Sequence, residues 1–334
     1  MLDGMFVFDA AVHVVDFSDE ALRPDRSDAV PGRDWVLRLG KETRWEGYNK
    51  DINFAKRWTI EEAYDWVFVD APTDMAMAMV VPTWFWWKDG AAPVATQHAF
   101  AEQYPDRVVF CGGVDPLSQG VDVALDQLDY QVKELGAVSI KFYNAHPGGG
   151  WRCDDEKLAY PLYERCLALG VKNVQFHKGA PFGLMNIEEL RPNDIQAPAR
   201  DYPDLTFIIH HLGVPYFDET VSIASRFPNV TLSLGLNMNM CVVAPRLIQD
   251  QLGRLLMEVG ADKLYWASDA VLSGGPRPYL EAFGALEIPE DLRDGFGYPQ
   301  ITREDKAKIL GLNFARLLGI DAEAKVEELY GLTV

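Results

Sequence analysis

The chain has 334 residues, of which 48% are hydrophobic and 24% charged, a composition that supports a full core and excludes a disordered, collagenous or coiled-coil protein. Its 31 Lys and Arg residues stand against 50 Asp and Glu residues, giving a net charge of −19. Such a surface repels phosphate backbones and anionic lipid, so we expect neither nucleic acid nor a membrane surface as a partner.

Sequence features that report on cellular location point to the cytoplasm. The cysteines are scattered without a C-x-x-C pair, which is typical of a reducing compartment: Cys111, Cys153, Cys166 and Cys241. The start of the chain lacks a basic leader followed by an apolar run, and no segment reaches about 18 apolar residues without charges. We therefore expect a cytoplasmic protein that is neither exported nor membrane-spanning.

Eight short apolar runs, rich in β-branched and aromatic residues, predict eight strands. Several, such as MAMAMVV and TFIIH, are apolar almost without interruption, as strands are when helices cover both faces of a parallel sheet. In chain order the predicted strands are Met5–Asp9, Ala76–Val81, Val108–Val114, Ala137–Tyr143, Lys172–His177, Leu205–His211, Val230–Leu234 and Lys263–Asp269.

Stretches with helical periodicity separate most of these runs. The first begins with a capping-box pattern, Thr59 followed by Glu62, and several end next to a glycine. The predicted helices are Thr59–Asp70, Gln119–Leu135, Lys157–Leu169, Phe217–Arg226, Pro245–Val259 and Thr302–Leu318.

The alternation of strands and helices predicts an α/β fold, a single (β/α)8 barrel (TIM barrel) formed by residues 1–334. An open doubly wound sheet shows the same alternation of strands and helices. Such sheets often carry a nucleotide-binding motif after a strand, and here no G-x-G-x-x-G or G-x-x-x-x-G-K-[ST] motif follows a predicted strand, so the barrel is favoured. Residues 17–57 are the longest irregular stretch, and we predict that they form a lid or an oligomer contact and not a second domain.

Polar residues with metal-ligating groups stand where the predicted strands end, and in a (β/α)8 barrel these ends share one rim. The candidates in chain order are Asp9, His13, Lys141, His177, His210, His211 and Asp269. Imidazole and carboxylate groups together are the ligands that zinc, iron or manganese takes. The predicted site is therefore a metal centre, with His177 and Asp269 also as catalytic residues.

Each candidate has a structural alternative. A single His at a strand end is more often a hydrogen-bonded structural residue, but five strand ends with such residues favour a shared site. Neighbours on a strand point to opposite faces, so we expect only one residue of the His210–His211 pair to enter the barrel. We choose His211 and assign His210 a packing or supporting role in the pocket. Asp9 and Asp269 could instead cap the segments that follow them.

Other residues could line a substrate pocket beside the metal. Trp84 and Trp86 belong to an aromatic run after the second predicted strand, and they could wall the pocket or plug a subunit interface. His146 lies on a predicted rim loop and could reach substrate. No G-x-S-x-G elbow occurs and no Cys is paired locally with a His, so covalent catalysis is unsupported and metal catalysis remains.

Several segments together resemble the amidohydrolase superfamily, in its family 2 branch near aminocarboxymuconate semialdehyde decarboxylase. They are FDAAVH, YPDRVVFCGGVDP, SIKFYN, VQFHKG, LTFIIHHLGVPYFDE, RFPNVTLSL, LYWASD and ITREDKAKILGLNFARLLGI. The resemblance implies a distorted (β/α)8 barrel with a divalent metal on its rim. It places His13, His177, His211 and Asp269 at metal-ligand or catalytic positions.

The first strand departs from the family pattern, which ends H-x-H where this chain has Ala11, Val12 and His13. Asp9 and Asp16 could supply carboxylate instead, which favours iron or manganese over zinc. Lys141 falls where some dinuclear members carry a carboxylated lysine that bridges two metals, and it could equally be a cation that faces the substrate.

With this first strand, the chain resembles a small group of dinuclear non-haem monooxygenases of the same fold, such as the hydroxylase of 2-aminoisobutyrate. The resemblance implies a metal-dependent oxygenase subunit that hydroxylates a small organic substrate with O2 at an iron or manganese site and receives electrons from partner proteins. The alternatives are a metal-dependent hydrolase or non-oxidative decarboxylase of a small carboxylate, and a non-catalytic subunit paired with an active paralogue. We also expect a homo- or hetero-oligomer with a related barrel subunit.

Overall fold

Eight parallel strands form the centre of the molecule in the computed structural model, which describes residues 1–49, 51–181, 183 and 185–332. The strands pair in chain order in one sheet. Their bounds are β1 Phe8–Val12, β2 Met75–Met79, β3 Val108–Gly113, β4 Ser139–Phe142, β5 Asn173–Phe176, β6 Thr206–Ile209, β7 Val230–Ser233 and β8 Leu264–Tyr265.

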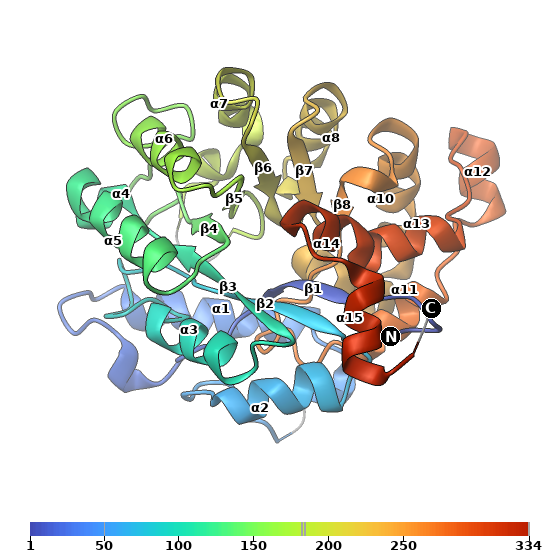
Figure 1. The fold of residues 1–334 in the computed structure, drawn as a ribbon, viewed down its shortest axis with the longest axis horizontal. Helices are drawn as coiled ribbons and strands as arrows, with labels where there is room; N and C mark the ends of the chain where they lie inside the picture. The colour runs from blue at the N-terminus through green and yellow to red at the C-terminus, as the bar shows by residue number, and fades with distance from the viewer. Residues whose placement is uncertain (50, 182, 184, 333–334) are drawn as a thin grey trace.

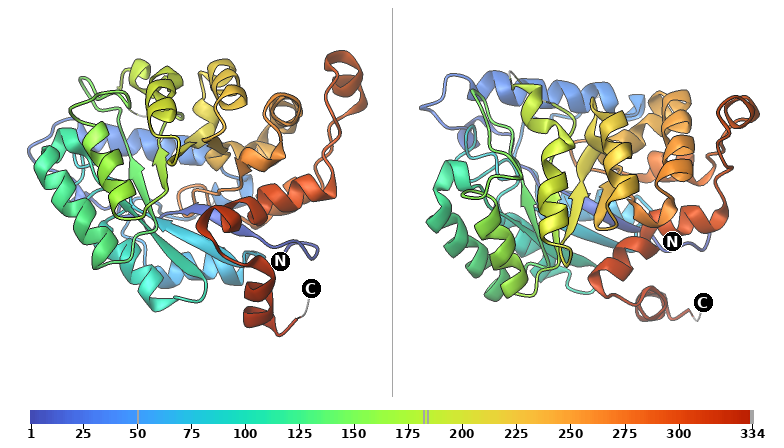
Figure 2. Two further views of the ribbon diagram at one scale, coloured as in Figure 1. Left: turned by 45° about the horizontal axis from the view of Figure 1, so that its top comes forward. Right: turned by 90° about the horizontal axis from the view of Figure 1, so that it is seen from above.

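Backbone hydrogen bonds between the first strand and the segment after the last one bring the two edges of the sheet together. The amide of Ala10 donates to the carbonyl of Trp266 at 3.1 Å, and the amide of Asp269 donates to the carbonyl of Ala11 at 3.0 Å. Helices surround the strands in all three views (Figures 1 and 2). The fold is the predicted (β/α)8 barrel.

The helices follow the strands around the barrel. Among the described residues, no helix is both long enough and apolar enough to cross a membrane. The α-helices are α1 Ala29–Thr43, α2 Ile60–Tyr64, α3 Val94–Gln103, α4 Pro116–Gln119, α5 Val121–Lys133, α6 Tyr160–Ala168, α7 Gln196–Asp201, α8 Phe217–Arg226, α9 Met240–Val243, α10 Pro245–Glu258, α11 Arg277–Gly284, α12 Glu290–Phe296, α13 Arg303–Ala307, α14 Asn313–Leu318 and α15 Ala322–Tyr330.

Strand β2 shows why its sequence is apolar on both faces. Met75, Met77 and Met79 belong to the cluster inside the barrel, whereas Ala76 and Ala78 pack in the cluster between the sheet and the helices outside it. All five residues are buried. The large Met side chains thus fill the barrel interior, and the small Ala side chains let the surrounding helices pack close to the outer face of the strand. The unbroken apolar run predicted this burial of both faces.

The predicted helix starts and ends are largely confirmed. Thr59 and Glu62 form the predicted capping box at the start of α2, which continues as a π-turn over Asp65–Val69. The predicted helix Thr302–Leu318 consists of α13, a π-turn and α14, and it ends at Gly319 in the left-handed conformation. Local capping chemistry therefore sets these boundaries.

Among the strands, the first and the last differ most from the prediction. The first strand is Phe8–Val12 and not Met5–Asp9, because Met5 pairs with Leu2 in a short turn before the strand. The shift places His13 directly after β1, on the rim. The last predicted strand, Lys263–Asp269, keeps only Leu264–Tyr265 as regular strand.

The prediction that residues 17–57 are irregular is wrong, since this segment contains the 15-residue helix α1. Pro31 and Gly32 hid the helix in the sequence. Pro31 lies in the first turn, where the missing amide costs no hydrogen bond. Gly32 is needed because a Cβ there would lie 2.6 Å from the ring of Trp86. Helix α1 therefore packs tightly against the loop after β2.

Candidate metal centre

His13 stands directly after β1 and points its ring at the end of β8. Its Nδ1 lies 2.8 Å from the carbonyl oxygen of Met79, which can only accept, so Nδ1 carries the proton of this hydrogen bond. Its Nε2 lies 3.3 Å from Oδ1 of Asp269. The backbone of β2 thus turns the second ring nitrogen of His13 toward a carboxylate.

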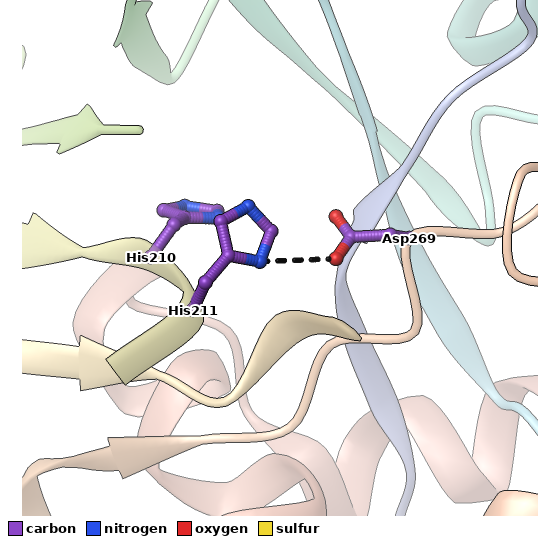
Figure 3. Close-up of side chains that lie close together, drawn as sticks. All are labelled: His210, His211 and Asp269. Carbon is purple, nitrogen blue, oxygen red and sulfur yellow. Dashed lines mark ion pairs between the residues drawn. The ribbon is translucent and has the colours of Figure 1, made fainter. Parts of the chain in front are cut away.

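His177 and His211 form the opposite wall of the same site. The Nε2 of His177 donates to the carbonyl oxygen of Ala180 at 3.3 Å, and its Nδ1 lies 3.1 Å from Nε2 of His211. Tyr143 stacks on the His177 ring at 4.3 Å between centroids. His211 Nδ1 then lies 3.5 Å from Oδ2 of Asp269, a contact drawn as a dashed line in Figure 3. The four predicted residues therefore meet.

The expectation that only one residue of the His210–His211 pair enters the barrel is wrong. Strand β6 ends at Ile209, and the next backbone turns through positive φ angles at His211 (57°) and Leu212 (52°). The alternation of a strand no longer applies there. His210, His211 and Asp269 each offer a ligand atom within 4.8 Å of the others, and Figure 3 shows the His210 ring beside that of His211, which faces Asp269.

The site combines an ionised carboxylate with neutral imidazoles. Burial alone would raise the pKa of Asp269, but His211, His13 and Lys141 outweigh it and lower that pKa to about 2. Burial lowers the pKa of His211 to about 4 and holds the pKa of His177 well below its usual range. At neutral pH the two imidazoles are therefore bases that can donate a lone pair.

The hydrogen-bond pattern fits a cation. Among the described residues, Nδ1 of His211 and Oδ2 of Asp269 are buried and have no hydrogen-bond partner. With Nδ1 of His13 protonated toward Met79, its Nε2 also presents a lone pair to the carboxylate. Facing acceptors repel each other unless a proton or metal ion lies between them. The donor set of imidazole nitrogen and carboxylate oxygen suits zinc, iron or manganese.

Gly235, at the start of the turn after β7, is a site residue that the sequence analysis missed. Its φ is +51°, and a Cβ there would lie 2.6 Å from Nδ1 of His211 and 3.1 Å from Oδ2 of Asp269. The absence of a side chain keeps this side of the site open. The only sequence signal is a glycine after an apolar run, which is also typical of an ordinary turn.

A mostly apolar pocket opens above the four residues, and helix α1 contributes to its wall. Its polar or ionisable side chains are those of the centre together with Thr83 and the phenol of Tyr143. Its lining is His13, Val15, Phe17, Val36, Leu39, Val81, Thr83, Trp87, Ala91, Tyr143, His177, Ala180, His211, Leu236, Asp269 and Leu272. Phe17, Val36 and Leu39 belong to residues 17–57, for which the sequence analysis predicts no helix, so it assigns these side chains to no helix face.

Four predicted site residues lie elsewhere. Asp16 pairs with Arg57 at 2.6 Å and accepts from Ser18, because an exposed guanidinium is within reach outside the pocket. Trp84 lines grooves on the outer surface. Trp86 is buried against α1, and its indole N–H donates a hydrogen bond to the carboxylate of Asp28. The tryptophan of this run that lines the pocket is Trp87. His146 lies 3.0 Å from Asp115 and outside the pocket lining.

Asp9 and Lys141 are buried in the barrel and do not line the pocket. The carboxylate of Asp9 accepts hydrogen bonds from the amides of Ser268 (2.9 Å) and Ala11 (3.3 Å), and burial raises its pKa to about 7. Burial lowers the pKa of Lys141 to about 7. The amides that bond to Asp9 belong to β1 and to the segment after β8, so Asp9 is not the N-cap of a following helix.

Comparison with known proteins gives a family and a fold. The model of a family described as Amidohydrolase matches residues 9–320. Over 102 residues, 29% of this chain, the sequence is 29% identical to the protein fluG of Emericella nidulans, and this stretch spans 11% of that protein.

Two solved structures illustrate the likeness of the fold. An uncharacterised TIM-barrel protein from Bordetella bronchiseptica has a TM-score of 0.67 and 20% identity, covering 94% of this chain and 99% of its own. A mutant of the 5-carboxyvanillate decarboxylase from Novosphingobium aromaticivorans, with bound manganese, has a TM-score of 0.58 and 14% identity, covering 95% and 98%. At these identities the two structures establish the fold alone.

Proposed function

We propose a function from one premise: this chain belongs to the amidohydrolase family, whose model matches nearly its whole length. The proposed function is that of a metal-dependent enzyme, a non-oxidative decarboxylase or a hydrolase of a small carboxylate. The observation that carries the proposal is the meeting of His13, His177, His211 and Asp269 at the base of an apolar pocket.

His13, His211 and Asp269 would hold a divalent metal, with His177 beside them. Manganese is the first candidate, since a decarboxylase of the same fold binds it, and iron and zinc suit the same donor atoms. When bound, the metal supplies a Lewis acid that polarises an oxygen of the substrate or of water.

Side chains of the chain itself would accept the proton and exclude water from the substrate. Asp269, ionised at neutral pH, accepts a proton from water or substrate beside it. Phe17, Leu39 and other apolar side chains of the wall exclude water from the substrate. An apolar surround weakens the solvation of a carboxylate, which favours breaking of its C–C bond and release of uncharged CO2. The electron pair left on carbon would take up a proton from water or from protonated Asp269.

The predicted oxygenase activity depended on carboxylates beside His13. Asp16 pairs with Arg57 outside the pocket, and Asp9 does not line the pocket. The argument from carboxylates beside His13 therefore no longer supports an oxygenase. A non-catalytic subunit would not need such a buried set of acceptors. The electron-transfer partners would be required only by an oxygenase. The oligomer, the cytoplasmic location and the role of residues 17–57 as a lid remain predictions.

Turnover in the absence of O2 tests the proposal. The purified protein would be stripped with chelator, reloaded with Mn²⁺ and incubated under argon with a panel of aromatic and small aliphatic carboxylates, esters and lactones. Release of CO2 or of a hydrolysis product that requires the metal would support the proposal. Turnover that occurs only with O2 and a reductant would overturn it, and so would failure of the stripped protein to bind Mn²⁺, Fe²⁺ or Zn²⁺.

A further inference from the structure

A directional chain of hydrogen bonds crosses the barrel interior and ends at His210. The carbonyl of Asn173 can only accept, so Ser139 Oγ donates to it, at 3.4 Å. Ser139 Oγ accepts from Nε2 of Gln175 at 2.9 Å, and Oε1 of Gln175 lies 2.7 Å from Nε2 of His210. The amide oxygen must accept there, so the proton of His210 is on Nε2.

The orientation of the Gln175 amide has a second support. Its Nε2 lies 3.1 Å from Sδ of Met77 and 3.9 Å from Sγ of Cys111. Both sulfur atoms are weak acceptors that favour an amide N–H over a carbonyl oxygen. The tautomer of His210 is therefore set by side chains on four strands of the barrel, β2, β3, β4 and β5.

The other ring nitrogen of His210 is left with a lone pair and nothing to bond. His210 is 0% exposed, and within the described part of the chain its Nδ1 has no hydrogen-bond partner. A buried acceptor without a partner is unfavourable, because it has lost its hydrogen bonds to water. The ring lies with His211 and Asp269 in the group whose ligand atoms are within 4.8 Å of one another (Figure 3).

We propose that His210 is itself a metal ligand, through Nδ1, at the centre formed with His211 and Asp269. This inference rests on the proposed function, because it assumes that the site holds a divalent metal. Imidazole ligands usually donate their second N–H to a partner that fixes the ring, and Gln175 fills that place here. The ligand set of this chain then includes two imidazoles from adjacent residues after β6, and Gln175 is a positioning residue for one of them.

Metal binding, read without activity, tests the proposal. Stripped wild-type protein, His210→Gln and Gln175→Leu would be titrated with Mn²⁺ by calorimetry, and the visible absorption of their Co²⁺ complexes would report the coordination. His210→Gln should weaken Mn²⁺ binding by more than about 100-fold and change the Co²⁺ spectrum, and Gln175→Leu should weaken it by about 10-fold. His98→Gln, on helix α3 and outside the pocket lining, is the matched control and should bind as wild type does.

The outcomes separate this inference from the proposed function. If wild-type protein binds Mn²⁺ and His210→Gln binds it equally well with the same Co²⁺ spectrum, the role of His210 is overturned and the proposed function stands. If wild-type protein binds none of the three metals, the proposed function fails and this inference fails with it. Circular dichroism in chelator shows whether a variant is folded. If His210→Gln does not fold, a normal affinity of Gln175→Leu overturns the proposal and a weakened one supports it.

Discussion

Nδ1 of His211 lies 3.5 Å from Oδ2 of Asp269, and neither atom finds a hydrogen-bond partner among the residues described. His211 comes from the turn after β6 and Asp269 from the segment after β8. With His211 neutral, the two atoms are both acceptors, and their proximity is unfavourable until a cation joins them.

Asp269→Asn should abolish most of the activity while leaving the fold intact. The amide is nearly isosteric but carries no charge, so it neither accepts a proton nor balances a cation. We expect kcat/KM to fall by about 10²–10⁴-fold and Mn²⁺ binding to weaken. Steady-state kinetics and calorimetry measure the two effects. Unchanged kinetics in a folded variant would contradict a role for this carboxylate.

Gly235→Ala should disturb the metal centre as well as the backbone. The new Cβ would lie 2.6 Å from Nδ1 of His211, and the left-handed φ adds a strain of about 1–2 kcal/mol. Gly319→Ala is the matched control, because Gly319 is also left-handed but has no atom within 4 Å of its ideal Cβ. Urea unfolding should show a loss of stability in both variants. Only Gly235→Ala should also lose affinity for Mn²⁺.

The metal-free protein should lose stability as the pH falls from about 6.5 to 4. The pKa of His211 is lowered from 6.5 to about 4 by burial, so the unfolded chain binds this proton more readily than the folded one. The stabilising contribution is complete above pH 6.5, is lost by about pH 4, and amounts to about 3 kcal/mol. Asp269, with its pKa lowered to about 2, adds a further loss below about pH 4. Urea unfolding of wild type and His211→Gln across this range measures the difference. Parallel curves would contradict the assignment.

Lys178→Met should destabilise the fold far more than removal of a surface ion pair. Lys178 follows His177, is 0% exposed, and lies 2.8 Å from Asp194, whose other contacts include the amide of Cys153. Loss of the amine leaves a buried carboxylate without its cation, which costs about 3–5 kcal/mol. Arg38→Ala, which breaks an exposed pair with Glu42, should cost less than about 1 kcal/mol. Equal losses in chemical denaturation would show that the buried pair contributes no more than the exposed one.

Leu39→Ala should show whether helix α1 shapes the substrate pocket. Leu39 lines the pocket from a helix that precedes β2, and truncation would open space beside the metal centre. We expect KM to rise for small substrates and the preference to move toward bulkier ones, with Mn²⁺ affinity unchanged. Val30→Ala, an exposed position on the same helix, is the control. Identical kinetics for Leu39→Ala would contradict a part for α1 in binding.

The sequence by itself determined the barrel and the four residues of its centre. Apolar runs such as β2 mark strands covered on both faces, and the ends of parallel strands share one rim, so His13, His177, His211 and Asp269 could be expected to meet. These inferences depend on local periodicity and on chain order, both of which a sequence carries.

Only the tertiary structure decided which way the side chains beyond the strands point. Ligand atoms of His210, His211 and Asp269 come within 4.8 Å of one another where the chain turns through a left-handed conformation at His211. Asp16 turns away because Arg57 is within reach. Helix α1 runs across Pro31 and Gly32, and the ring of Trp86 occupies the space that a side chain at position 32 would need. Beyond a strand end, backbone angles and side-chain partners are set by residues distant in the chain, and no local pattern encodes that choice.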